Sequence, residues 1–359
     1  MSGGAAMSPL AALMRPEIRA LKAYAHAAWL PHLTRLHANE APWRPTDDRS
    51  EAGLNRYPEP QPEALLERLA EVYAVPARNI LATRGSDDAI DVLSRIFLRA
   101  GEDAILQCSP TFGMYQVAAR IQGAEVIDVP LERAQRWRLA PERLLAAWTP
   151  RAKLVYLCSP NNPTANLLDS AAVETVCAAL AGKAVIVIDE AYIEWTAQAS
   201  ATTWLARFPT LAILRTLSKS HALAGARVGA LIGPEELIEG GRRVIPPYCL
   251  AEPTIAAALR ALSVAELART KSRITALLAE RDYLHAGLAD SPLVTAVWPS
   301  DTNFLLVDSS AADEFLRAAM RGGTIVRDLR AYPALAQSLR VTVGVRADND
   351  ALLNSVAPS

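Results

Sequence analysis

The sequence predicts an α/β protein, with a large domain built on a mostly parallel sheet covered by helices and a smaller α/β domain. Two features of the chain lead to this prediction. After residue 58, short segments that are apolar at nearly every position alternate with segments of helical periodicity, and this rhythm fades near residues 245–247. Such alternation is typical of a doubly wound sheet. Strands that are apolar throughout are expected where helices cover both faces of the sheet.

The individual elements follow from the spacing of apolar side chains and from their capping residues. Residues 62–75 have apolar positions at helical spacing and a proline in the first turn. Residues 86–100 form a second predicted helix, with Ser86 as its N-cap. Further apolar runs predict strands at residues 79–85, 103–110, 124–130, 153–160, 183–192 and 211–219, and a helix is predicted at residues 169–182.

Beyond residue 247 the pattern changes to long helices and then to two shorter repeats. Helices are predicted at residues 252–263 and 264–290, followed by strand–helix repeats at 302–309 with 311–323 and at 324–330 with 339–348. This change sets the predicted domain boundaries. They are an N-terminal arm with part of the small domain at residues 1–45, the large domain at 46–247 and a C-terminal small domain at 248–359.

Composition argues against several classes of function. The 359 residues include 37 Lys and Arg against 38 Asp and Glu, a formal charge of −1, which disfavours nucleic-acid binding and a polybasic membrane-surface protein. The sequence has no run of about 18 apolar residues, so no membrane span is expected. The four cysteines form no C-x-x-C pair, which indicates a reducing cytoplasm and no metal site. The first twenty residues resemble a flexible arm more than a signal peptide.

One stretch of the chain raises a question about charge. Residues 211–233 contain three cations, Arg215, Lys219 and Arg227, and no carboxylate that could pair with them. A buried cation without a partner is costly. We therefore expect these side chains either to reach water or to surround an anion.

Polar residues follow several of the predicted strands, at the edge where ligands bind in open α/β sheets. One strand leads into Ser86 and a helix N-terminus, which could hold a phosphate through its backbone N–H groups. The strand ends together offer a phosphate-binding turn, an amide, a buried acid with a phenol, and an unpaired lysine. This combination predicts a site for pyridoxal 5'-phosphate. The other strand ends supply the amide Asn162, the pair Asp189 and Tyr192, and Ser218 with Lys219.

The chemistry of this cofactor accounts for each residue type. A lysine amine forms its Schiff base, and neighbouring cations favour the neutral, nucleophilic amine. A buried aspartate such as Asp189 keeps the pyridine nitrogen protonated, which the cofactor needs to act as an electron sink. The Asn162 amide and the Tyr192 hydroxyl could donate to the phenolic oxygen, provided that the chain turns after Asp189. Ser218 and Arg227 could bind the phosphate, whose negative charge would neutralise the three cations.

Each residue alone has a simpler interpretation. Asp189 could be a turn or capping residue, Asn162 a turn before proline, and Lys219 a surface lysine. All of these simpler interpretations would have to be true at once for residues that stand at successive strand ends. A single site that explains all of the residues is therefore the better interpretation. Other motifs are weaker. The sequence has no glycine-rich nucleotide loop after a strand, and His32 and His37 match no familiar zinc spacing.

With these residues the sequence resembles the fold-type I pyridoxal phosphate aminotransferases of the class II subfamily, and within them the branch that acts on histidinol phosphate. The resemblance runs in order from about residue 20 to residue 345. The most specific segments are LNRYPEPQP and CSPNNPT with DEAYIE. The full set is LHANEAPW, LNRYPEPQP, TRGSDD, SPTFGMY, VYLCSPNNPT, VIDEAYIEW, ILRTLSKSHALAGARVG, TIVRD and LRVTVG.

The resemblance implies an activity and an assembly. The activity is transfer of an amino group between L-histidinol phosphate and 2-oxoglutarate, which gives imidazole acetol phosphate and L-glutamate in histidine biosynthesis. The assembly is a homodimer with a shared active site, in which Tyr57 reaches the cofactor phosphate of the neighbouring subunit. Two alternatives stay open: an aromatic amino acid aminotransferase, and a decarboxylase like threonine-phosphate decarboxylase.

The resemblance also implies roles for individual residues. Lys219, Asp189 and Tyr192 would be catalytic: Lys219 would carry the Schiff base and shuttle a proton, and Asp189 would hold the pyridinium. Phe112 would stack on the ring. The remaining cofactor contacts would come from Ser86, Asp87, Ser218 and Arg227 at the phosphate and from Asn162 and Tyr192 at the phenolic oxygen. The substrate would be contacted by Tyr24, Asn39, Arg327 and Arg340, with the two arginines at its phosphate.

Four positions depart from the family pattern. Ala165 stands where glycine is usual, and His221 stands where an aromatic residue is common. Phe112 lacks the hydroxyl that is often present, and the sequence after Gly85 is Ser-Asp-Asp. None of these changes removes a covalent or charged role, but His221 lies near Lys219 in the chain and therefore bears on substrate fit.

Overall fold

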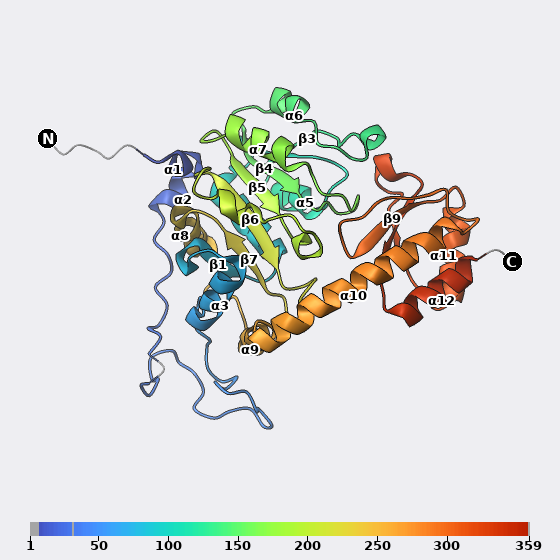
Figure 1. The fold of residues 1–359 in the computed structure, drawn as a ribbon. Coiled ribbons are helices and arrows are strands. Elements are labelled where there is room, and N and C mark those ends of the chain that lie inside the picture. Colours follow the sequence, from blue (N-terminus) through green and yellow to red (C-terminus); the bar gives the residue numbers. More distant parts are fainter. Residues whose placement is uncertain (1–6, 31, 358–359) are drawn as a thin grey trace.

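Two sheets covered by helices make up the structure, a computed structural model that describes residues 7–30 and 32–357 (Figure 1). The larger sheet has seven strands in the spatial order β1-β7-β6-β5-β4-β2-β3. Its strands run parallel apart from β7, so the predicted mostly parallel sheet is confirmed. In chain order the strands are β1 (Ile80–Thr83), β2 (Ala104–Gln107), β3 (Glu125–Asp128), β4 (Ala152–Cys158), β5 (Val185–Asp189), β6 (Leu211–Thr216) and β7 (Gly229–Ile232).

The connection between β6 and β7 explains the reversed direction of β7. Parallel neighbours need a long crossover, usually a helix, whereas residues 217–228 form only turns and return the chain antiparallel beside β6. This connection carries Ser218, Lys219 and Arg227. The reversal therefore places these three side chains at the carboxyl end of β6.

Helices cover both faces of the large sheet. In β5, Val185 and Val187 pack in one apolar layer, whereas Ile186 and Ile188 pack in the other. The first layer contains α1 (Pro9–Leu13), α2 (Pro16–Ala20), α4 (Ser86–Phe97), α5 (Met114–Ile121) and α8 (Glu235–Val244). The second contains α3 (Glu63–Tyr73), α6 (Pro141–Ala147), α7 (Ser170–Ala179) and α9 (Glu252–Ala261).

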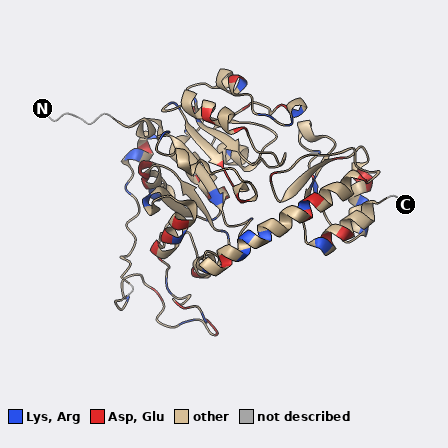
Figure 2. Ribbon diagram, in the orientation of Figure 1, with Lys and Arg blue, Asp and Glu red and all other residues tan. Residues whose placement is uncertain are grey.

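The smaller sheet is antiparallel, with the order β10-β11-β9-β8. The long helix α10 (Val264–Ala289) runs from beside α9 to this sheet, and it carries both signs of charge along its length (Figures 1 and 2). Helices α11 (Ala312–Arg321) and α12 (Arg346–Val356) pack on the sheet. Its strands are β8 (Ala296–Val297), β9 (Phe304–Asp308), β10 (Arg327–Asp328) and β11 (Ser338–Thr342).

The N-terminal residues lie in two environments. Leu10 and Met14 are buried with residues of α4 and α8, on the large sheet. Residues 21–30 and 32–62 form no helix or strand, and the chain there extends away from the body (Figure 1). The domain boundaries at residues 45 and 247 stay a prediction. Residues 1–6, 31 and 358–359, which the predicted domains include, lie outside the described residues.

A few elements differ from the sequence prediction. Strand β3 lies at the edge of the sheet and is only partly buried, instead of being covered on both faces. Ser86 is the first residue of α4, and Gly85 takes the N-cap position with a φ of 84°. In the last predicted repeat, residues 338–342 form a strand and the helix begins only at Arg346. Strand β7 and helix α8 were not predicted.

Two features are absent from the described residues. None of their helices combines the length with the apolar character that crossing a membrane requires. Their His, Cys, Asp and Glu side chains form no group that could hold a metal ion.

Candidate active site

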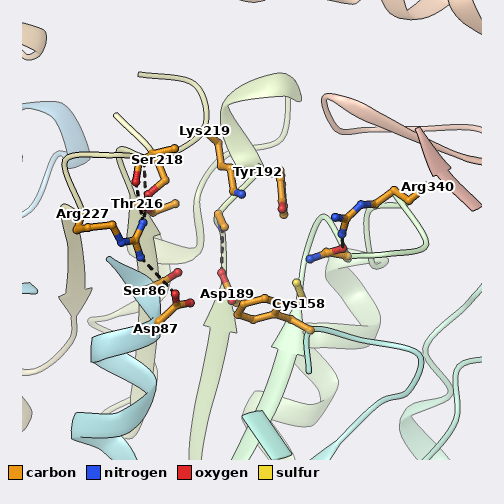
Figure 3. A pocket seen from close by; sticks show the side chains of 14 residues that line it. Ser86, Asp87, Cys158, Asp189, Tyr192, Thr216, Ser218, Lys219, Arg227 and Arg340 are labelled. Carbon is orange, nitrogen blue, oxygen red and sulfur yellow. Dashed lines mark hydrogen bonds and ion pairs between the residues drawn. The ribbon is translucent and has the colours of Figure 1, made fainter. Parts of the chain in front are cut away.

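A cavity of about 220 Å³ opens at the carboxyl ends of β4, β5 and β6, beside the N-terminus of α4 (Figure 3). Ligands bind at this edge in sheets of this kind. Ten of the residues predicted from sequence line the cavity, so the fold brings them together. The lining residues are Ser86, Asp87, Phe112, Cys158, Asn162, Asp189, Ala191, Tyr192, Thr216, Ser218, Lys219, Ala224, Arg227 and Arg340.

One end of the cavity is built to bind an anion. Helix α4 begins at Ser86 and directs its N-terminal N–H groups there. Arg227 donates to the Ser218 hydroxyl at 3.2 Å and to the Asp87 carboxylate at 3.2 Å (Figure 3). Gly85 makes room for this arginine, because a Cβ at residue 85 would lie 2.6 Å from Arg227 Nη2.

Asp189 lies at the centre of the cavity and is 2% exposed. As the last residue of β5, it accepts hydrogen bonds from the Tyr115 hydroxyl at 2.6 Å and from the Ala191 N–H at 3.1 Å. Burial raises the pKa of the Asp189 carboxyl to about 6, although these two donors and Lys219 favour its charged form. Tyr115 is itself buried and stacks on Tyr156, with ring centroids 4.4 Å apart.

Lys219 approaches the cavity from the side opposite Asp189 (Figure 3). Its Nζ lies 5.6 Å from the centroid of the Tyr192 ring. Burial lowers the pKa of the Lys219 amine, and the positive charges of Arg340 and Arg227 lower it further. The site therefore favours the neutral amine, which is the nucleophilic form.

The end opposite Arg227 is closed by Arg340, which β11 supplies from the small domain (Figure 3). Arg340 donates a hydrogen bond to Asn162 Oδ1, and its guanidinium lies 5.3 Å from the Phe304 ring centroid. Because Arg340 binds the Asn162 oxygen, the orientation of this amide is fixed, and its Nδ2 is the donor group. Burial lowers the pKa of Arg340.

A second cavity of about 470 Å³, the outer cavity, adjoins the first and shares Phe112, Asn162 and Arg340 with it. Arg327 lines the outer cavity and pairs directly with Arg340 in the register of β10 and β11. The structure thus places two arginines side by side: Arg327 is exposed, and Arg340 is half-buried and lines both cavities.

The predicted site residues of the N-terminal segment lie elsewhere within the single chain. Tyr57 and Asn39 line a different cavity, where Tyr57 stacks on Tyr248 at a centroid distance of 4.7 Å. Tyr24 lines a fourth cavity, together with Trp29. The fold of one chain therefore does not bring these three predicted residues to Lys219.

The expectation of three unpaired cations is wrong for two of them. Arg215 is buried and binds Glu194 at 2.8 Å and Glu190 at 3.5 Å. Arg227 pairs with Asp87. These carboxylates are far from residues 211–233 in sequence. They become neighbours because the turn after β5 and the start of α4 lie next to the end of β6, which the local sequence does not reveal.

Besides Ala191 and Ala224, three lining or supporting residues were not predicted. Tyr115 holds Asp189 from α5, three positions after Phe112 and on the same segment as the family motif SPTFGMY. Cys158 and Thr216 line the cavity from the ends of β4 and β6. Apart from its place in that motif, Tyr115 looks like an ordinary core tyrosine in the sequence, and no local signal marks the other two.

The departures from the family pattern have different consequences. His221 is buried beside the Ser220 hydroxyl at 2.9 Å and does not line the first cavity. Ala165 is fully buried with a φ of 67°, a conformation that glycine adopts more easily. Phe112 lines both cavities. Of these three residues, Phe112 is the one placed to touch a ligand.

The three parts of the first cavity fit pyridoxal 5'-phosphate. Its anion-binding end, at Arg227, suits the phosphate, and a lysine with a lowered pKa suits the aldehyde. Asp189 has no ion-pair partner within the described residues, which leaves its carboxylate for a protonated ring nitrogen. When bound, this cofactor supplies an electron sink for bond changes at the amine-bearing carbon of the substrate. The fold and the cavity therefore define a fold-type I pyridoxal phosphate enzyme.

The chain belongs to the aminotransferase class I and II family, whose family model matches residues 36–356. It is 43% identical over 349 residues to the histidinol-phosphate aminotransferase of Xanthomonas campestris, with 96% of each chain covered. It is also 43% identical over 353 residues to the enzyme of that name from Stenotrophomonas maltophilia, again with 96% of each covered. The protein is thus a pyridoxal 5'-phosphate-dependent aminotransferase, as the sequence predicted.

Solved structures share the fold. The histidinol-phosphate aminotransferase from Clostridium acetobutylicum has a TM-score of 0.76 at 19% identity, covering 84% of this chain and 90% of that one. The enzyme of that name from Sinorhizobium meliloti, in complex with pyridoxal-5'-phosphate, has a TM-score of 0.76 at 25% identity, covering 84% of this chain and 82% of that one. The predicted fold class and cofactor are confirmed.

Proposed function

We propose that the protein transfers an amino group between L-histidinol phosphate and 2-oxoglutarate, giving imidazole acetol phosphate and L-glutamate in histidine biosynthesis. The observation that carries this proposal is the pair Arg327 and Arg340 in the outer cavity, beside Lys219. Histidinol phosphate has no carboxylate, so its phosphate is the anion that the enzyme can recognise. A guanidinium binds phosphate or carboxylate bidentately, so the same pair serves both half-reactions. The names of the relatives support the same activity.

In this proposal the catalytic work falls to Lys219, Asp189 and Tyr192. The Lys219 amine would hold the cofactor and, once the substrate's amine has displaced it, would act as the neutral base that moves the proton of the substrate's amine-bearing carbon. The Asp189 carboxylate holds the proton on the ring nitrogen. The Tyr192 hydroxyl and Asn162 Nδ2 donate to the phenolic oxygen. Arg340 supports this arrangement because it binds the Asn162 oxygen and thereby fixes which way the amide points.

The cofactor phosphate and ring are held by the remaining lining residues. Arg227, Ser218 and Ser86 bind the phosphate. Asp87 contributes its backbone N–H, because its carboxylate is already bound to Arg227. Phe112 packs against the ring.

The proposal extends to a cytoplasmic homodimer with a shared active site. In a single chain Tyr57, Tyr24 and Asn39 lie away from Lys219, so their proposed roles require a second copy. Tyr57 would reach the partner's cofactor phosphate, and Tyr24 and Asn39 would contact substrate. Residues 46–247 are assigned to the large cofactor-binding domain, 1–45 to the arm with part of the small domain and 248–359 to the small domain.

A comparison of three amines with the purified enzyme tests the activity. L-Histidinol phosphate, L-phenylalanine and L-threonine phosphate are incubated with and without 2-oxoglutarate, while glutamate and carbon dioxide are measured. We expect glutamate from histidinol phosphate, only when 2-oxoglutarate is present. A preference for phenylalanine would replace this proposal with an aromatic aminotransferase, and carbon dioxide from threonine phosphate would replace it with a decarboxylase.

A further inference from the structure

The small domain presents one continuous stretch, residues 327–340, to the outer cavity. Four lining residues come from this stretch, and the rest come from the large domain. The four are Arg327, Leu329, Tyr332 and Arg340. These four residues form one wall of the outer cavity. The position of this wall relative to Lys219 therefore depends on the contacts that hold residues 327–340 against the large domain.

Arg133 of the large domain holds the middle of the stretch. It lies in the loop after β3, and its Nη1 donates to the Ala334 carbonyl at 3.0 Å while its Nη2 donates to Asp308 Oδ2 at 2.7 Å. The guanidinium packs beside two neighbouring tryptophans, 5.1 Å from the Trp137 ring centroid and 5.2 Å from that of Trp298, and these two centroids lie 5.5 Å apart. Trp137 belongs to the large domain, whereas Trp298, Asp308 and Ala334 belong to the small domain. One side chain of the large domain thus contacts three groups of the small domain.

Asp308 transmits this contact to β11. Its buried carboxylate also accepts from Trp298 Nε1 at 2.7 Å and from the Ser338 hydroxyl at 2.5 Å. Ser338 pairs with Asp308 in the sheet, and Arg340 lies two residues further along the same strand. Arg133 therefore fixes residues 327–340 at Ala334 directly and at Ser338 through Asp308.

Apolar contacts also cross between the domains, since Leu329 and Leu335 pack in the large-sheet core. Apolar packing has little directional preference and permits small displacements of the wall. The planar fork of an arginine that donates to two fixed acceptors is directional and limits such displacements. Two directional contacts therefore set the direction of the wall: Arg133 binds Ala334 and Asp308, and Arg340 binds Asn162.

We propose that Arg133 is a positioning residue, which holds residues 327–340 so that Arg340 reaches over the cofactor site. It touches neither substrate nor cofactor and acts through Arg340. The inference uses the proposed function only for the choice of substrate in the kinetic test. The structural test below does not depend on it.

Backbone hydrogen exchange of the holoenzyme tests the mechanical claim. The variants are Arg133→Met, which removes both hydrogen bonds, and Arg133→Lys, which keeps a cation but not the fork. The control is Arg138→Met, because Arg138 lies in the same loop and its side chain bonds only Gln135 among the described residues. We expect faster exchange in residues 329–340 for both Arg133 variants and unchanged exchange for the control. Unchanged exchange in Arg133→Lys, or equal changes in the control, would overturn the proposal.

Kinetics test the action through Arg340. Arg133→Met should raise KM for histidinol phosphate about tenfold with kcat nearly unchanged, because misplacement of a binding group weakens binding steeply. KM for unphosphorylated histidinol should hardly change. In an Arg340→Gln background, Arg133→Met should have no further effect on KM. Additive effects would show that Arg133 does not act through Arg340. If wild-type enzyme ignores histidinol phosphate while the exchange result holds, the proposed function fails and the positioning role stands.

Discussion

Asp189 connects the stability of the fold with its chemistry. Burial raises the pKa of the carboxyl to about 6 from an ordinary value of 3.8. A carboxyl with a higher pKa in the folded state contributes its stability fully below the unfolded pKa, and this contribution is lost as pH rises through the folded value. Above pH 7, the Asp189 carboxyl of the cofactor-free protein is charged. Burial of this charge lowers the free energy of unfolding by about 3 kcal/mol compared with burial of the protonated group.

Asp189→Asn should separate stability from turnover. In the cofactor-free protein it should raise the free energy of unfolding above pH 7 by up to about 3 kcal/mol, and the gain should shrink towards pH 4. Turnover should fall by orders of magnitude, since an amide cannot hold the ring-nitrogen proton. Denaturant unfolding at several pH values and single-turnover assays measure the two effects. Near-normal transamination would mean that Asp189 is only a structural residue.

Lys219 should be the lysine that carries the cofactor. The purified protein should be yellow, and reduction with borohydride should attach a pyridoxyl group to Lys219, which peptide mass spectrometry locates. Lys219→Ala should lose this covalent link and still bind some cofactor, because the anion-binding end at Arg227 is intact. Lys183→Ala is the matched control, since Lys183 is solvent-accessible beyond α7 and does not line the cavity. A label on another lysine would refute the assignment.

Arg327 should matter for the substrate's phosphate. Arg327→Ala should weaken histidinol phosphate by about 1.5–3 kcal/mol in kcat/KM, the range for a lost charged hydrogen bond, and should affect histidinol much less. Arg330→Ala provides the control, because Arg330 follows on the same segment but pairs with Asp313 and Asp328 and does not line the outer cavity. Equal losses for both amines would leave Arg327 without a phosphate role and would favour the aromatic aminotransferase.

At the scale of single residues, sequence reasoning succeeds where a strand end fixes a side chain. Asp189 and Asn162 follow predicted strands and line the cavity as expected. Sequence reasoning fails for ion pairs whose two partners come from strands that become neighbours only in the folded sheet. The carboxylates that bind Arg215 come from the adjacent strand's turn, and strand order is set by crossovers that local sequence does not encode.

At the scale of elements, a close approach between β7 and α4 builds the anion-binding end. A Cβ on Gly229, the first residue of β7, would lie 2.6 Å from the carbonyl carbon of Gly85 and 2.8 Å from the Ser86 nitrogen. These are backbone atoms at the start of α4, so they cannot rotate aside as a side chain can. Glycine at residue 229 thus lets the helix N-terminus stand beside the strand.

Gly229→Ala should damage both stability and cofactor binding. The added methyl must push the start of α4 away, which should lower the free energy of unfolding by about 1–3 kcal/mol, the range for overpacking. Calorimetry and cofactor titration of the same sample measure the two losses. Gly225→Ala is the control, because a Cβ there meets nothing within 4 Å. Wild-type cofactor affinity in Gly229→Ala would show that the position of α4 does not govern phosphate binding.

The elements that could be predicted are those with strong periodicity. Helix α4 follows from its helically spaced apolar side chains, and strand β5 follows from its unbroken run of apolar residues. Strand β7 was missed because it begins at a glycine and because parallel-sheet reasoning expects a helix before the next strand. The start of α12 was missed because the strand β11 and the helix follow each other within a few residues.

At the scale of the whole molecule, the N-terminal segment suggests a partner. Residues 21–30 and 32–62 leave large apolar side chains exposed, among them Leu36 at 91% and Trp43 at 79%. Soluble monomers seldom expose apolar groups in such density, and an interface between identical subunits would cover them. Motifs in this segment were recognised from the sequence, but one chain's fold leaves Tyr24, Asn39 and Tyr57 away from the first cavity, and the proposed homodimer would bring them to the site of a second chain.

A mixing experiment tests whether Tyr57 serves the neighbouring subunit. Tyr57→Ala and Lys219→Ala should each be largely inactive, since one lacks the proposed phosphate contact and the other lacks the amine. In a mixed dimer, one site combines Lys219 of the first chain with Tyr57 of the second, and both are intact there. Random mixing makes about half of the dimers mixed, each with one intact site, so about a quarter of wild-type activity should return. If Tyr57 acted on its own chain, every site would lack one of the two groups and the mixture would stay inactive.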